Sequence, residues 1–142
     1  MKAPTTHLCI LGLASAFLLA GCESAPARNP RTTRTVVLSP ARPSPEVEMG
    51  LVSAIRVVLP GPEPGSALSW EIAANNARVL EQLGPIVVAP LPEAGDGKPV
   101  STVSFYVLKP GRSLLRFYLL DPKLGETVPA ATCALTVRVV DE

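Results

Sequence analysis

The sequence predicts an all-β fold in which antiparallel strands form two sheets packed face to face. Apolar and polar residues alternate along several segments after residue 46, and a period of two is typical of strands with one face on a core. Turns rich in glycine and proline separate these segments, as expected for a β-sandwich of about seven or eight short strands. The region 46–142 has the length of a single small domain.

The expected strands follow from this alternation. In the segments 53–59, 100–108 and 114–120 and in the last strand from residue 133, the large apolar residues share one face. These residues are Ile55, Val57, Leu59, Val103, Phe105, Val107, Leu115, Phe117, Leu119, Cys133, Leu135, Val137 and Val139. A short apolar run at 86–89 predicts a further strand, whereas 73–83 is ambiguous between a helix and a turn at Asn75-Asn76.

Two turns are expected between these strands. Lys109-Pro110-Gly111-Arg112 predicts a tight turn that joins two antiparallel strands, since Gly111 can adopt a positive φ. The second turn is expected at Gly95-Asp96-Gly97.

Two single residues have a structural and a functional interpretation. Trp70, the only tryptophan, is expected to anchor the core at the start of a strand, and the alternative is a ligand platform. Cys133 is expected to be a small core residue, because the alternation turns it inward. The alternative is a reactive thiol.

The N-terminal segment has the layout of a secretory signal. Met1-Lys2 precedes an apolar run from Leu8 to Ala20, which is too short for a stable membrane-spanning helix. The run ends in Leu19-Ala20-Gly21-Cys22, which resembles the lipobox of bacterial lipoproteins. The resemblance implies that 1–21 is removed and that Cys22 carries a diacylglycerol and an acylated amino group, which anchors the chain in a lipid bilayer. The alternative is an ordinary signal, or an apolar helix, followed by an incidental cysteine.

The residue after the cysteine bears on the compartment. Glu23, rather than an aspartate, follows Cys22, and this favours the outer membrane, facing the periplasm, in a Gram-negative cell envelope.

If the signal segment is removed, the remaining chain lacks the residues that most catalytic mechanisms require. His7 is the only histidine, so a chain from Cys22 onward has no histidine-based triad and no histidine-ligated metal site. We therefore expect no cofactor, no metal and no enzyme. The best catalytic alternatives are carboxylate pairs, Glu93 with Asp96 or Asp121 with Glu126, although such acids more often lie on solvated turns.

The segment 22–45 is expected to be a tether. It contains five prolines and four arginines, with Val36-Val37-Leu38 as one apolar patch that could add an edge strand. The arginines could contact anionic headgroups, and the alternative is a solvated linker without a partner. In the region 46–142 acidic residues outnumber basic ones, so a nucleic-acid partner is not expected, and the domain is expected to be a monomer.

The order of elements resembles the chagasin-like inhibitors of papain-type cysteine peptidases. The first loop of that family reads Asn-Pro-Thr-Thr-Gly-Tyr-Ser-Trp, and here Glu63 is followed by Pro64, Gly65, Ser66, Ala67, Leu68, Ser69 and Trp70. A glycine-rich loop before an aromatic strand corresponds to Gly95 and Gly97. The third loop, Arg-Pro-Trp in the family, corresponds to Asp121, Pro122 and Lys123, with Glu126 further on.

This resemblance implies an immunoglobulin-like antiparallel β-sandwich over 46–142, whose three loops gather at one end. In the family these loops enter a peptidase cleft and block it without being cut. The implied inhibitory residues are Pro64, Gly65, Ser66, Ala67, Leu68, Gly95, Gly97, Asp121, Pro122 and Lys123. The alternative function is an envelope lipoprotein that uses the same scaffold to bind a different partner.

Overall fold

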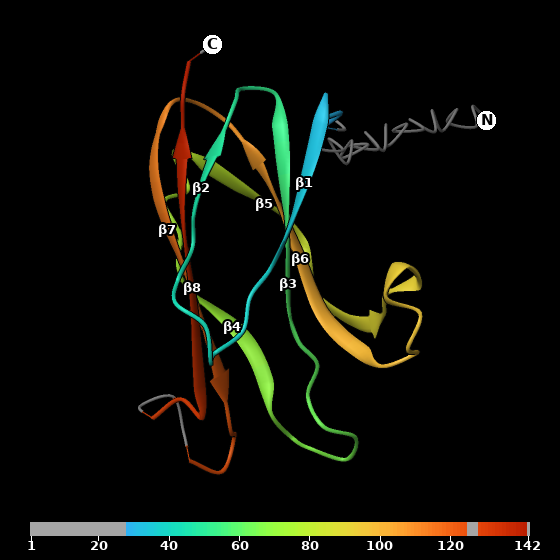
Figure 1. Cartoon of the computed structure of the whole chain (residues 1–142). Helices are drawn as coiled ribbons and strands as arrows, with labels where there is room; N and C mark the ends of the chain where they lie inside the picture. Colours follow the sequence, from blue (N-terminus) through green and yellow to red (C-terminus); the bar gives the residue numbers. More distant parts are fainter. Residues whose placement is uncertain (1–27, 125–127, 142) are drawn as a thin grey trace, which may run out of the picture.

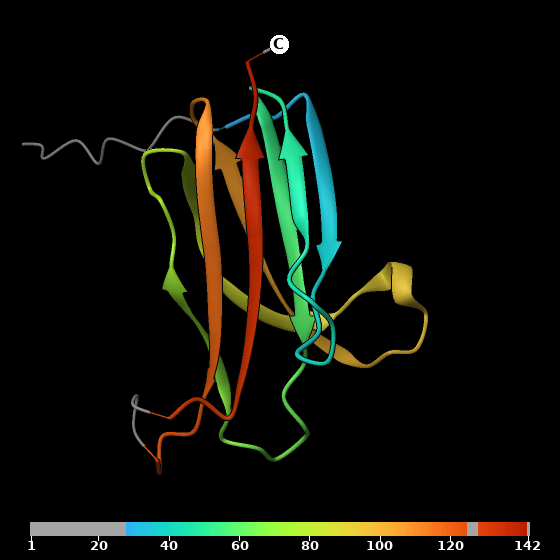
Figure 2. The same cartoon turned by 60° about the vertical axis from the view of Figure 1, so that its left-hand side comes forward.

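The computed structural model describes residues 28–124 and 128–141, which form a β-sandwich (Figures 1 and 2). Its strands are β1 (Thr32–Val37), β2 (Glu46–Met49), β3 (Ser53–Pro60), β4 (Ser69–Ala74), β5 (Leu80–Pro90), β6 (Pro99–Val107), β7 (Gly111–Leu120) and β8 (Ala131–Val139). One sheet has the order β1-β3-β6-β5 and the other has the order β2-β8-β7-β4. The predicted two-sheet, all-β fold is confirmed.

Four of the six strand pairs are antiparallel, and two are parallel. β1 runs parallel to β3, and β2 runs parallel to β8. The cause is the path of the chain, which descends along β1, crosses to the other sheet for β2 and returns to the first sheet for β3. The purely antiparallel expectation is therefore wrong at these two edges, while the pairs that frame the loops are antiparallel.

The core is built from the alternating side chains that the sequence predicted. Ile55, Leu59, Phe105 and Phe117 are fully buried between the sheets. Burial of such a set of aliphatic and aromatic side chains is the main favourable contribution to folding. Trp70 is also buried, and its indole Nε1 donates a hydrogen bond to the carbonyl of Pro60, 2.8 Å away. The predicted structural role of Trp70 is confirmed.

Part of the predicted tether belongs to the sandwich. Thr32–Val37 forms β1, an edge strand in register with β3 from Thr32↔Ser53 to Val37↔Val58. Leu38 is buried in the core and Val36 packs against it. The apolar patch at 36–38 is thus the part of the segment that docks, because it can bury apolar side chains while its backbone bonds to β3.

The turn at 109–112 differs from its prediction. It does not join a hairpin, because β6 pairs with β3 and β5, whereas β7 pairs with β4 and β8. The turn instead carries the chain from one sheet to the other, and Leu108 N donates a backbone hydrogen bond to Val79 O at 2.9 Å. A short turn that bridges two packed sheets has the same sequence signals as a hairpin turn.

The ambiguous segment 73–83 contains the end of β4, a turn and the start of β5. The turn is formed by Asn75 and Asn76, since Val79 N bonds to Asn76 O and the Asn75 side-chain amide donates to Leu80 O. The run 86–89 lies within the longer strand β5. In the described part of the chain, no helix is long and apolar enough to cross a membrane.

Candidate functional site

Three loops lie at one end of the sandwich, and we call them the loop edge. They are 61–68 between β3 and β4, 91–98 between β5 and β6, and 121–130 between β7 and β8, described except at 125–127. Both views place 61–68 between the other two loops (Figures 1 and 2). Loops 61–68 and 121–130 lie at the bottom of both views, whereas 91–98 projects from the side of the molecule above them.

The middle position of loop 61–68 follows from strand register. The loop begins next to 91–98, because Pro60 pairs with Val100, and it ends next to 121–130, because Ser69 pairs with Leu120. Gly61 fixes the first of these junctions: a Cβ at this position would lie 1.9 Å from the Pro99 carbonyl oxygen. Only a glycine allows the two loops to approach this closely.

Loop 61–68 is held by a turn at its tip. Ser66 N donates to Glu63 O at 2.9 Å, Pro64 occupies the second position and Gly65 has a φ of 80°, which is the pattern of a type II turn. Ser66 Oγ then accepts a hydrogen bond from Leu68 N at 3.1 Å. Glu63, Pro64 and Gly65 are exposed at the tip, so the loop presents a short, ordered and small-residue surface.

Loop 91–98 is also ordered by local contacts. It contains the 3-10 turn Pro92–Ala94, and Gly95 follows in the left-handed conformation with a φ of 68°. Gly97 has a φ of 67°, and Asp96 Oδ1 accepts a hydrogen bond from Lys98 N at 3.0 Å. The predicted turn at 95–97 is therefore present, and all three of its residues are exposed.

Loop 121–130 carries the third group of predicted residues. Asp121 shapes its start, because its Oδ1 accepts from Lys123 N at 2.9 Å and its carbonyl accepts from Leu124 N at 3.0 Å. Pro122 and Lys123 are exposed. Sequence reasoning missed the apolar contribution of this loop, since Leu124 is 63% exposed and Val128 is 62% exposed. Isolated apolar residues in a loop have no periodicity, but their position beside an expected contact residue was a usable signal.

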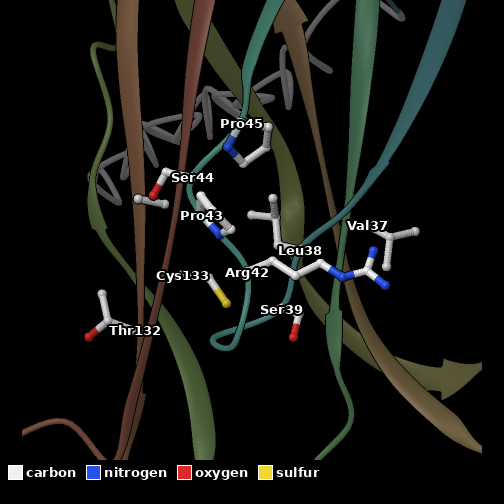
Figure 3. Close-up of a pocket in the computed structure, with 10 residues that line it drawn as sticks. Val37, Leu38, Ser39, Arg42, Pro43, Ser44, Pro45, Thr132 and Cys133 are labelled. Atoms are coloured by element: carbon white, nitrogen blue, oxygen red, sulfur yellow. The ribbon is translucent and has the colours of Figure 1, made fainter.

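Cys133 lies away from the loop tips and is buried on β8. Its side chain faces the 38–45 connection, where it lines a pocket of about 210 Å³ together with Leu38, Arg42 and Pro43 (Figure 3). Burial raises the pKa of the Cys133 thiol by desolvating the thiolate. The predicted core position is confirmed, and the raised pKa disfavours the nucleophilic form at neutral pH.

Three of the four acids in the two possible catalytic pairs have structural partners. Glu93 forms an ion pair with Arg56 across 3.7 Å, while Asp96 and Asp121 accept the backbone hydrogen bonds described above. Glu126 and Cys22 lie outside the described residues. Within the described ranges, no cluster of three or more histidine, cysteine, aspartate or glutamate side chains could hold a metal ion.

Comparison with known proteins identifies the fold. No family model matches the chain, and no curated protein matches it. The crystal structure of the cysteine protease inhibitor EhICP2 from Entamoeba histolytica is similar with a TM-score of 0.60 and 12% identity, over 79% of this chain and 100% of that chain. The solution structure of amebosin gives a TM-score of 0.54 and 13% identity, over 79% and 100% of the two chains. This similarity shows a shared β-sandwich fold, in agreement with the fold expected from the chagasin-like resemblance.

Proposed function

We propose that this chain is a lipid-anchored inhibitor of papain-like cysteine peptidases and that the loop edge blocks the peptidase cleft. The observation that carries the proposal is the ordered central loop 61–68, flanked by two further loops on a fold similar to a cysteine protease inhibitor. Fold alone does not determine function, so the proposal depends on the chemistry of the loop edge.

The tip of loop 61–68 suits insertion into a narrow cleft. Pro62, Pro64 and the turn at Gly65 restrict the free loop, so that little conformational entropy is lost on binding. Gly65, Ser66 and Ala67 are small, which allows close approach of the backbone to a catalytic thiolate. Among the described residues other than glycine, only Val52 has a positive φ, so the backbone of Ala67 is unstrained. The left-handed position of the turn is occupied by Gly65. Blocking requires no proton transfer and no covalent bond.

The two outer loops supply the rest of the proposed contact. Loop 121–130 has Lys123 at the position where the resembled family has a tryptophan, and Leu124 and Val128 are the exposed apolar groups beside it. Aromatic anchors usually dominate interface energy, and the described residues of the loop edge include no aromatic side chain. Inhibition is therefore expected to be weaker than that of proteins with the full motif.

The proposed anchor is Cys22, acylated in a bacterial cell envelope. The support is Leu19-Ala20-Gly21 before the cysteine and the apolar run that precedes it. Labelled fatty acid is expected to enter the wild-type chain in a bacterial host but not a Cys22→Ala variant. Equal labelling of the two chains, or none, would contradict the anchor.

The inhibition assay uses a chain that begins at Arg28, because all eight strands lie after this residue. Inhibition of papain-like peptidases is expected to be reversible and competitive. Ser66→Arg is expected to weaken it, because a long charged side chain would be desolvated in the cleft. The matched control is Thr33→Arg, which places the same side chain on the exposed edge strand β1.

Two results would contradict the inhibitor function. One is a lack of inhibition at high micromolar concentration, and the other is equal inhibition by the Ser66→Arg variant and the wild-type chain. The envelope interaction module with another partner would then be the better interpretation, and the absence of an aromatic residue at the described loop edge is the observation that favours it.

A further inference from the structure

The end of the sandwich opposite the loop edge is formed by three turns and by the segment that leads into β1. The turns are 50–52, 75–79 and 108–110, and the leading segment is 28–31. We call these residues the anchor end. Figure 1 shows this end at the top of the molecule, and Figure 2 shows the same separation from the loops. β3 links the two ends with eight residues, which corresponds to roughly 26 Å.

The chain arrives at the anchor end through specific contacts. Arg28 Nε lies 3.0 Å from the Glu81 carboxylate, and its guanidinium lies 5.3 Å from the centre of the Tyr106 ring. Arg31 N donates to Val52 O at 2.8 Å, after which β1 runs toward the loop edge. The point of entry is therefore fixed on the domain before the first strand begins.

Few residues separate this entry point from the proposed lipid. Six residue steps join Cys22 to Arg28, so the two Cα atoms are at most about 22 Å apart, even in a fully extended chain. This reach is shorter than the length of the sandwich. A bilayer that holds Cys22 is thus necessarily close to the anchor end.

The charge of the two ends differs. The anchor end contains Arg28, Arg31, Arg78 and Lys109. Two acidic residues lie at the same end: Glu81, which pairs with Arg28, and Asp141, which follows β8. The described loop edge contains Glu63, Glu93, Asp96 and Asp121 against Lys98 and Lys123, and Arg42 lies in the 38–45 connection that leaves β1 at the same end. An anionic bilayer attracts basic residues near its surface and repels acidic ones. Charge therefore favours one orientation of the domain.

Two apolar side chains project among these cations. Val52 is 36% exposed and directly precedes β3, and Leu108 is 38% exposed and directly follows β6. Val52 holds a φ of 58°, a conformation that a β-branched residue rarely adopts and that glycine or asparagine would adopt with less strain. An apolar side chain kept at a strained, exposed position is consistent with a contact made outside the domain.

We propose that the anchor end lies against an anionic bilayer and that the loop edge points away from it. This orientation rests on the lipidated Cys22 of the proposed function and deepens it by naming the partner. The loops then meet peptidases that are free in the aqueous compartment, at a height of roughly 26 Å or more above the headgroups, given the length of β3. A peptidase with its cleft held at the same membrane surface is excluded from the loop edge.

The test uses the full chain, made in a bacterium that lipidates it and reconstituted into vesicles of phosphatidylglycerol and phosphatidylethanolamine with a headgroup-linked quencher. A fluorophore is placed at Leu108→Cys or at Glu63→Cys, both in a Cys133→Ser background. Strong quenching is expected at 108 and little at 63. Equal quenching at the two positions, or stronger quenching at 63, would overturn the orientation.

Two double charge-reversal variants test the electrostatic contribution to the proposed orientation. Arg78→Glu with Lys109→Glu is expected to reduce quenching at 108 severalfold, because each cation near an anionic surface contributes about fivefold to binding. Lys98→Glu with Lys123→Glu has the same net charge but changes only the loop edge, and it is expected to leave quenching unchanged. An equal effect of the two pairs would contradict the role of the anchor end.

Inhibition of a soluble peptidase is measured on matching vesicles that carry the unlabelled wild-type chain, because a fluorophore at 63 would occupy the loop tip. Loss of inhibition with the quenching pattern intact contradicts the inhibitor function alone. Inhibition with quenching at 63 contradicts the orientation alone, and a wild-type chain without lipid contradicts both the anchor and the orientation.

Discussion

At the scale of single residues, the loop edge depends on glycines that meet different physical demands. Gly61 is required by space, because a Cβ would lie 1.9 Å from a backbone oxygen. Gly65 is required by conformation, since its φ is 80° while a Cβ at this position would have no atom within 4 Å. Substitution of Gly61 therefore tests steric crowding, whereas substitution of Gly65 tests backbone strain.

Gly65→Ala is expected to destabilise the chain by about 1 kcal/mol, because an L-residue in the left-handed region costs about that much. Gly61→Ala is expected to cost more, about 3 kcal/mol, because the overlap forces β3 and β6 apart where two loops join. Unfolding by urea of chains that begin at Arg28 measures both. A smaller loss for Gly61→Ala than for Gly65→Ala would be inconsistent with the close contact to Pro99.

Cys133 provides a second prediction at this scale. Burial raises the pKa of its thiol, so the folded state holds the proton more tightly than the unfolded state. Stability from this group is then present at neutral pH and falls as the pH rises above the pKa of the unfolded thiol. Cys133→Ser is expected to remove this alkaline loss without changing inhibition. The measurement is the melting temperature of both chains as a function of pH. The same fall in melting temperature above about pH 9 in the Cys133→Ser variant and the wild-type chain would argue against this prediction.

At the scale of elements, β1 shows how much of the fold the sequence predicts. The strands around Phe105 and Phe117 were predictable, because one buried and one solvated face impose a period of two. β1 was predictable only from its last residues and the leucine that follows them. Thr32 to Thr35 are exposed and polar, so a parallel edge strand of this kind has no alternation from which to recognise it.

Removal of residues up to 45 is expected to lower the melting temperature relative to a chain that begins at Arg28. The loss comprises β1, the partly buried Val36 and the buried Leu38, and a buried leucine side chain alone contributes about 2–5 kcal/mol. Differential scanning calorimetry of the two chains measures the difference. Equal melting temperatures would indicate that β1 adds nothing to the sandwich.

The third loop is the element where sequence reasoning was least complete. The resemblance directed attention to Lys123, whereas the structure adds Leu124 and Val128 as exposed apolar groups. The conformation at the start of this loop, 121–124, follows from Asp121 and the backbone hydrogen bonds that it accepts, which composition does not reveal.

Lys123→Trp is expected to strengthen inhibition about tenfold, because a buried aromatic anchor adds more than about 1 kcal/mol to an interface. Leu124→Ser is expected to weaken it by a similar factor. Lys109→Trp, at the opposite end, is the matched control and is expected to change nothing. The measurement is the inhibition constant of the wild-type chain and of each of the three variants. An equal effect of Lys109→Trp and Lys123→Trp would contradict the assigned contact.

At the scale of the whole molecule, the two ends of the sandwich have different proposed functions, membrane anchoring and peptidase binding. One end receives the chain from the proposed lipid anchor, and the other presents the three loops of the loop edge. The strand order explains why 61–68 is the central loop: it joins one sheet to the other, while 91–98 and 121–130 each connect neighbouring strands within a sheet. The central claim is therefore that loop 61–68 occupies a peptidase cleft.

The most direct measurement of that claim is protection of the catalytic thiol of a papain-like peptidase from an active-site alkylating reagent. The chain that begins at Arg28 is expected to slow alkylation in a saturable manner, to remain uncut at loop 61–68, and to lose protection with Ser66→Arg. Slower substrate turnover without protection of the thiol, or cleavage within loop 61–68, would contradict the account.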